Sequence, residues 1–167
     1  MPLIKLQSEG LNLADNFAFT GTVSGAGGGK ILQVQNTTSS TQRTTQSNSF
    51  VDSGLAVSIT PSATSSKILI LFSSYGYADT TGVGSNYTLY RDSTNIGDSS
   101  KGLFMFRNGA NNIEYGMNFI IYDSPSSTSA ISYKVYHRIE SGSAAISYIS
   151  RYSTPSHLTA MEISAWL

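Results

Sequence analysis

The feature that most constrains the fold is a short alternation of apolar and polar residues that recurs along most of the chain. Leu55, Val57 and Ile59 alternate with small polar residues, and segments 86–91 and 130–136 show the same period of two. Successive side chains of a β-strand point to opposite faces, so this period predicts strands with one buried face. No window of helical length carries apolar residues at spacings of three and four between capping residues.

These segments predict an all-β fold. Turn-forming residues separate them at intervals of roughly eight to twelve residues, which is typical of a β-sandwich. The apolar run 67–72 predicts a central strand buried on both faces, and Pro61 ends the strand before it. We therefore expect an antiparallel, jelly-roll-like β-sandwich with an extended N-terminal arm. The predicted strands are 30–35, 41–50 (an edge or hairpin strand), 54–60, 67–72, 86–91, 102–106, 113–122, 130–136, 144–149 and 157–166.

The first 29 residues differ from the rest, and we interpret 1–29 as an arm and 30–167 as the sandwich domain. The arm ends in the glycine-rich stretch 24–29, whose backbone is costly to order and packs little. This stretch is not a phosphate loop, because Ile31 follows Lys30 where Ser or Thr is required. The arm is too apolar for a simple tether, and residues 17–23 alternate weakly like a short strand. The residues expected to anchor the arm to a partner are Leu3, Ile4, Leu6, Leu11, Leu13, Phe17 and Phe19.

The charge pattern argues against two classes of partner. The formal net charge is zero, charged residues make up 12% of the chain, and Lys and Arg are scattered. Nucleic-acid binding draws most of its affinity from clustered cations, and so does binding to anionic lipid, so we expect neither partner. The N-terminus lacks the apolar core of a signal peptide, and no apolar run approaches a membrane span. The absence of cysteine excludes disulfides and thiolate metal sites.

Catalytic and metal-binding patterns are also missing. The two histidines, His137 and His157, have no nearby third ligand, and no serine lies in a G-x-S-x-G turn. A Ser–His–Asp set could be assembled with Asp123, but with so many serines this match carries little information. We therefore expect a non-enzymatic protein without metal or cofactor.

Ten tyrosines and one loop are the remaining candidates for an interaction surface. Tyrosine suits a subunit interface or a sugar-binding surface, although cross-strand packing at the sheet margin is the favoured reading. The odd spacing of Tyr133 and Tyr136 predicts that they lie on opposite faces. The candidate interface aromatics are Tyr75, Tyr77, Tyr133 and Tyr136. The candidate exposed tip loop is Asp79, Thr80, Thr81, Gly82, Val83, Gly84 and Ser85.

Several segments together resemble a β-domain common in structural proteins of tailed phages, especially phages of marine and freshwater bacteria. The resemblance runs in order over most of the chain, and the arm segment 11–27 is similar to the lead-in of such proteins. The segments that carry it are 29–34, 49–55, 57–70, 89–96, 123–135 and 158–163.

This resemblance implies a jelly-roll-like homotrimer displayed on the virion surface, with no catalytic residues. One role is a capsid decoration, or cement, protein whose arm lies on the major capsid protein. The alternative is a tail-fibre or receptor-binding knob that attaches to a tail or baseplate adaptor and binds host glycan. The short arm without coiled-coil heptads favours the first role. A free sugar-binding lectin fits the fold but not the glycine-rich arm.

Overall fold

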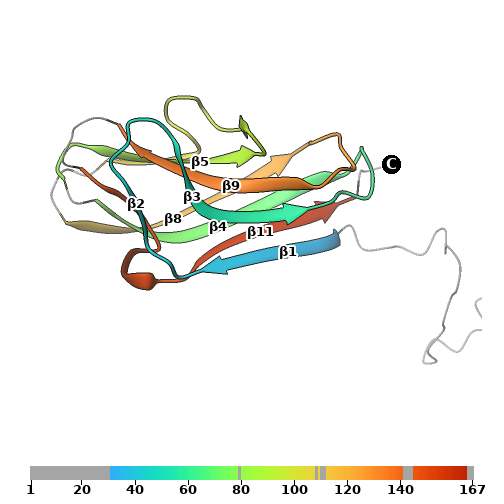
Figure 1. Ribbon diagram of the computed structural model, residues 1–167, viewed down its shortest axis with the longest axis horizontal. Coiled ribbons are helices and arrows are strands. Elements are labelled where there is room, and N and C mark those ends of the chain that lie inside the picture. The colour runs from blue at the N-terminus through green and yellow to red at the C-terminus, as the bar shows by residue number, and fades with distance from the viewer. Residues whose placement is uncertain (1–30, 79, 108, 110–111, 141–144, 165–167) are drawn as a thin grey trace, which may run out of the picture.

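The computed structural model describes residues 31–78, 80–107, 109, 112–140 and 145–164, which form two antiparallel sheets packed face to face (Figure 1). Sheet A contains β1 (Ile31–Ser39), β2 (Arg43–Thr45), β4 (Lys67–Ala78), β8 (Ile113–Asp123), β10 (Ser147–Ile149) and β11 (Ser156–Ile163). Sheet B contains β3 (Val51–Ile59), β5 (Gly84–Arg91), β6 (Thr94–Asn95), β7 (Phe104–Arg107) and β9 (Ile131–Ile139). The predicted all-β, antiparallel, jelly-roll-like sandwich is confirmed.

Strand order shows that distant parts of the chain meet in each sheet. In sheet A, β11 lies between β1 and β4, β8 pairs with the other edge of β4, and β10 and β2 continue beyond the end of β11. In sheet B the order is β3, β9, β5, and both β6 and β7 pair with β5. A short 3₁₀ turn, η2 (Arg151–Ser153), precedes β11. No helix in the described ranges is long and apolar enough to cross a membrane.

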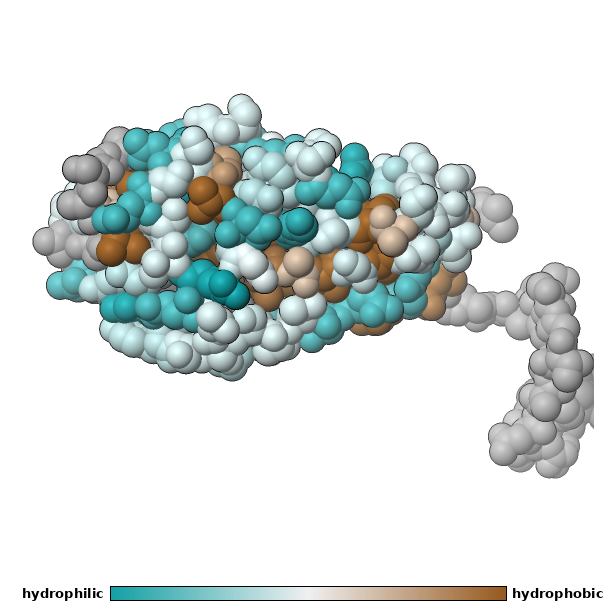
Figure 2. Space-filling model, in the orientation of Figure 1, coloured by the Kyte–Doolittle hydropathy of each residue, from teal (hydrophilic) through white to brown (hydrophobic). Residues whose placement is uncertain are grey.

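The predicted alternation sets the core between the sheets. Leu55, Val57 and Ile59 are at most 4% exposed and face sheet A, as their period of two predicts. Phe72 and Phe119 meet with ring centroids 4.7 Å apart. The view in Figure 2 faces the seam between the sheets, where hydrophobic residues form a narrow band near β3 and β11, with separate hydrophobic spots toward the left end among hydrophilic and intermediate residues.

The expectation that segment 67–72 is buried on both faces is only half correct. Ile68, Ile70 and Phe72 point into the core and are at most 2% exposed. Leu69 and Leu71 point to the outer face of sheet A and are only partly buried. β4 is central within its sheet, as predicted, but no described element packs against the outer face of that sheet.

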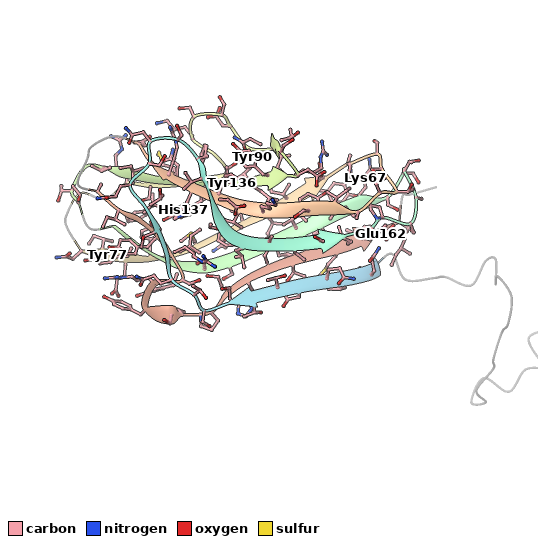
Figure 3. All side chains as sticks on the ribbon, in the orientation of Figure 1. Lys67, Tyr77, Tyr90, Tyr136, His137 and Glu162 are labelled. Atoms are coloured by element: carbon pink, nitrogen blue, oxygen red, sulfur yellow. The ribbon has the colours of Figure 1, made fainter. Side chains whose placement is uncertain are left out.

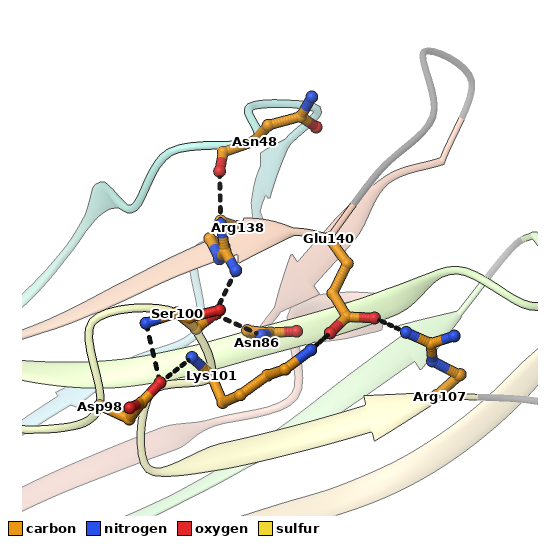
Figure 4. Close-up of polar contacts among 8 residues, drawn as sticks. All are labelled: Asn48, Asn86, Asp98, Ser100, Lys101, Arg107, Arg138 and Glu140. Atoms are coloured by element: carbon orange, nitrogen blue, oxygen red, sulfur yellow. Dashed lines mark hydrogen bonds and ion pairs between the residues drawn. The ribbon is translucent and has the colours of Figure 1, made fainter.

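The outer face of sheet B is different, because the segment 92–103 folds over it (Figure 4). Arg138 donates to the backbone oxygens of Asn48 and Ser100, and Asn86 Nδ2 donates to the same Ser100 oxygen at 3.1 Å. Glu140 lies between the cations of Lys101 and Arg107 and pairs with both. Sheet B therefore has a charged, partly covered outer face, while none of the described segments covers that of sheet A.

Candidate interaction surface

The register of sheet A places side chains of four strands in rows across its outer face. Each row joins β1, β11, β4 and β8 through directly paired residues. The first row is Val34, Met161, Leu69 and Tyr122, and the second is Asn36, Thr159, Leu71 and Ile120. The third is Thr38, His157, Ser73 and Asn118. The face is therefore apolar toward the end where β1 begins and polar beyond the second row.

We call this region the apolar half of sheet A. It consists of Ile31, Val34, Leu69, Leu71, Ile120, Tyr122, Met161 and Ile163. Ile120 is 67% exposed, Ile31 54%, Tyr122 53% and Val34 51%. Large apolar side chains gathered at such exposure are typical of a surface that contacts another protein. In sequence, the signal was the unbroken apolar run 68–72, which is more apolar than a one-sided strand requires.

The edge of sheet A next to this region is open as well. Among the described strands, β8 pairs only with β4, so the other backbone edge of this 11-residue strand has no partner strand. Between Glu114 and Asp123 the strand carries no charge and no proline, the features that usually protect an edge from pairing. The β8 edge can therefore accept a further strand.

The opposite end of the same face carries an aromatic cluster around Arg151. The guanidinium carbon lies 4.4 Å from the ring centroid of Tyr77, and 4.5 Å from those of Tyr148 and Tyr152. Ser150, Tyr152 and Ser153 adopt left-handed backbone angles, with φ of 53°, 56° and 58°. Such angles are unfavourable for residues with a Cβ, so this turn is strained. The contacts of the Arg151 guanidinium with the three rings stabilise it. Figure 3 shows Tyr77 at this end, and Lys67 and Glu162 at the opposite end.

The four candidate interface aromatics do not lie together. Tyr75 and Tyr77 share the outer face of β4, and the hydrogen bond from Tyr75 to Glu114 raises the pKa of that tyrosine. Tyr136 lies on the outer face of sheet B, stacked on Tyr90 with centroids 3.9 Å apart.

The expectation that Tyr133 belongs to an interface is wrong. It lies on the face opposite Tyr136, as the odd spacing predicts, but this is the core face. Its side chain is 0% exposed and its hydroxyl donates to Asp123 at 2.6 Å. Because burial is nearly complete, Tyr133 cannot line an interface, and burial raises the pKa of its hydroxyl.

A buried chain of hydrogen bonds contains one histidine. His137 Nδ1 lies 3.2 Å from Ser147 Oγ, which donates to the hydroxyl of Tyr87 at 3.1 Å. Burial lowers the pKa of His137 to about 4, so this ring is neutral at pH 7. His137 is 1% and Ser147 0% exposed, so a substrate cannot reach this pair.

The other members of the hypothetical Ser–His–Asp set lie elsewhere. Asp123 pairs with Arg91 at 2.9 Å, and His157 lies on the outer face of sheet A, 3.1 Å from Thr38 Oγ1. No group of three or more His, Cys, Asp or Glu among the described residues could hold a metal ion.

Glu162 is a buried carboxylate that was not among the residues singled out from the sequence. It is 0% exposed and faces inward from β11. Its Oε1 accepts hydrogen bonds from Ser62 N at 2.7 Å, Ser62 Oγ at 2.6 Å and Ser66 Oγ at 2.6 Å, and its Oε2 accepts one from Gln33 Nε2 at 2.6 Å. Burial by itself raises the pKa of Glu162, but these hydrogen bonds outweigh it and lower the pKa to about 2. The carboxylate therefore links β1 and the β3–β4 turn to β11. In the sequence, this role was indicated by the single acidic residue within the segment 157–166.

The candidate tip loop is shorter than the predicted range. Thr81 and Gly82 are exposed, but Gly84 and Ser85 begin β5 and are buried. Their inclusion in the loop is thus a correction, because the strand starts earlier than residue 86. Asp79 and the anchor residues of the arm, Leu3, Ile4, Leu6, Leu11, Leu13, Phe17 and Phe19, lie outside the described residues.

No family model matches the chain, and no curated protein matches its sequence. Among solved structures, the chain is similar to VP2 in the subviral particle of infectious bursal disease virus, with 15% identity and a TM-score of 0.50. The match covers 91% of this chain and 38% of that one, so the chain spans well under half of the protein it matches. Structures of the Gx and Gt strains of the same virus match at 14% identity with TM-scores of 0.45 and 0.43. These two cover 80% and 92% of this chain and 33% and 44% of theirs. At this identity the first likeness shows a shared fold.

Proposed function

We propose that this protein is a non-enzymatic structural component of a virion. In this proposal it is a homotrimeric capsid decoration, or cement, protein of a tailed phage, displayed on the virion surface and attached through its N-terminal arm. The observation that carries the proposal is the apolar half of sheet A, an exposed group of large apolar side chains of the kind that contacts other proteins. The fold shared with a chain of a viral particle and the sequence resemblance to phage structural proteins support the same role.

The composition of that surface fits a permanent contact between proteins. Each half-exposed Ile, Val or Tyr would contribute on the order of 1 kcal/mol when covered, and several lie side by side. The apolar half contains no carboxylate, and Lys67 at its margin donates to Ser124 Oγ at 2.8 Å. Covering the residues of the apolar half therefore buries none of their own charges, because they carry none.

A second role, a tail-fibre or receptor-binding knob for host glycan, rests on the cluster around Arg151. Tyr152 is 61% exposed, and the amide oxygen of Gln42 accepts from the Tyr152 backbone N–H at 3.2 Å. Exposed aromatic rings beside polar groups suit the stacking and hydrogen bonding of a sugar ring. This cluster is at the polar end of sheet A, so it would stay accessible while the apolar half is covered.

Attachment of labelled protein to purified particles tests the proposed function. Electron microscopy of gold-labelled full-length protein would show label over the capsid for a cement protein and at the tail for a fibre knob. A Leu3→Asp, Leu6→Asp variant should lose most of its occupancy, because charges cannot enter an apolar contact. The matched control is Gln7→Asp, Ser8→Asp, which adds two charges to the same part of the arm and should keep it. Absence of label on particles would refute the virion role.

A further inference from the structure

We propose that the apolar half of sheet A binds the N-terminal arm of a neighbouring copy of this chain. The inference rests on the proposed function and gives the arm a second contact: the segment 11–23 binds the neighbouring copy, and Leu3, Ile4 and Leu6 attach the trimer to the particle. It is carried by the position at which the arm joins the sheet, the exposure of the apolar half, and the open edge of β8.

The arm joins the sheet at the same end as the apolar half. Ile31, the first residue of β1, pairs with Ile163, which pairs with Lys67 at the start of β4. The apolar half occupies this end of β1, β11, β4 and β8. Phe19, the last anchor residue of the arm, lies twelve residues before Ile31. Twelve extended residues span up to about 40 Å, while the face from β1 to β8 is about 15 Å wide, so the arm is long enough to reach this surface on an adjacent copy.

The direction of β1 favours a neighbouring copy over the chain's own face. β1 runs from Ile31 along the sheet toward Ser39, and Figure 1 shows it beginning at the end of the sandwich. A chain that enters β1 in line with the strand comes from beyond that end, away from its own sheet. To reach its own face, the chain would have to reverse its direction before Ile31.

The expected symmetry points to the same arrangement. A contact between two identical faces is isologous and forms a two-fold pair, whereas a contact between an arm and a face is heterologous and can close into a ring. The homotrimer in the proposed function therefore requires a heterologous contact. An arm that binds the next copy provides such a heterologous contact, and no other interface is needed to close the trimer.

The chemistry of the two surfaces is complementary. The arm supplies alternating apolar residues at 17–23, and the apolar half exposes Ile120 and Tyr122 beside the open backbone edge of β8. A segment of this pattern can add to a sheet edge as an extra strand, with backbone hydrogen bonds along the edge and side chains on the apolar face.

Disulfide trapping tests the inference, because the natural chain contains no cysteine. One chain carries Leu13→Cys with a large tag, and a second carries Ile120→Cys with a small tag. The two are mixed, allowed to exchange and oxidised. We expect a disulfide between the differently tagged chains. In the control, Ser58→Cys on the exposed outer face of β3 replaces Ile120→Cys and should give at least tenfold less product.

Other trapping results would overturn the inference. A Leu13→Cys, Ile120→Cys double variant that closes within one chain would place the arm on its own sheet. Ile120→Cys chains that link mainly to each other would show face-to-face pairing. No linkage at Ile120 above the Ser58 control would mean that the arm does not bind this surface.

Light scattering of point variants provides a second measurement. Ile120→Asp should convert the oligomer to monomer, because it places a charge in the contact, and its far-ultraviolet circular dichroism should stay that of the folded chain because Ile120 is exposed within one chain. Asn118→Asp, two residues earlier on the same face of β8, is the matched control and should leave the oligomer intact. An oligomer that survives Ile120→Asp would contradict the inference. Trapping in isolated protein without attachment to particles would refute the virion role alone, and attachment without trapping would refute the arm's partner alone.

Discussion

Replacement of Glu162 by glutamine tests how the end of sheet A is held together. The substitution keeps the shape of the side chain but removes its charge. An amide NH₂ cannot accept the hydrogen bonds that Ser62 and Ser66 donate to Oε1. Because these groups are buried or partly buried, the lost acceptor leaves donors unsatisfied next to the β3–β4 turn.

The magnitude follows from the pKa of the carboxyl group. Lowering this pKa from 4.5 to about 2, at about 1.4 kcal/mol for each pH unit, stabilises the folded state by about 3 kcal/mol. The folded state binds the proton more weakly than the unfolded state, so this stabilisation is complete above pH 4.5. It is lost as the pH falls toward 2, and about 1 kcal/mol remains at pH 2.5.

Urea denaturation followed by far-ultraviolet circular dichroism measures both effects. At pH 6 we expect Glu162→Gln to lower the free energy of unfolding by about 3 kcal/mol, and at pH 2.5 the gap to the natural protein should shrink to about 1 kcal/mol. Glu114→Gln, at an exposed position of β8, is the matched control and should cost less than about 1 kcal/mol. A gap that stays equal at both pH values, or a variant as stable as the natural protein at pH 6, would refute this account of Glu162.

Two further predictions concern the core and one turn. Burial lowers the pKa of His137 to about 4, so stability should fall as the pH drops from 6.5 to 4.5, by about 2 kcal/mol from this group. His137→Gln should abolish that part of the pH dependence of the free energy of unfolding, and an unchanged pH dependence would show that His137 has the same pKa in the folded and unfolded states. Gly102→Ala should lower the melting temperature strongly, because φ is +72° and the added Cβ would lie 2.3 Å from the backbone oxygen of Tyr87. Gly82→Ala shares the positive φ, +78°, but has open space, so it should cost only about 1 kcal/mol; equal losses would rule out the steric clash.

Local pattern was sufficient for the long strands and the core, since Leu55, Val57 and Ile59 lie where a period of two places them, but the predicted strand 41–50 contains only the short β2 and β6 was not predicted. Pattern could not assign the outer faces, because the coverage of a face depends on segments distant in sequence. Leu69 and Leu71 look like core residues in the run 67–72, yet they are partly exposed because nothing described covers them. The same limit applies to Tyr133. The alternation shows that it lies on the face of its strand opposite Tyr136, but it does not show which of the two faces is buried.

The candidate surface depends on register, which the sequence leaves open. Ile120 and Leu71 become neighbours only because β8 pairs with β4 in one register, and a shift by one residue would turn Ile120 inward. The cluster around Arg151 needs three left-handed residues without glycine, and no turn rule predicts that arrangement. Both features arise from tertiary contacts that a reading of single segments cannot supply.

The position of β11 between β1 and β4 sets an order for folding during synthesis. β1 is made early, but its described strand partner is β11, made more than 110 residues later. Until β11 is synthesised, β4 can pair with β8 in the nascent chain, but β1 lacks its described partner strand. Closure of sheet A is therefore a late step with high contact order, and such pairing is slow. A chaperone that shields unpaired strands would act in that interval, and a stall in translation before Ser156 would leave β1 available to the wrong chain.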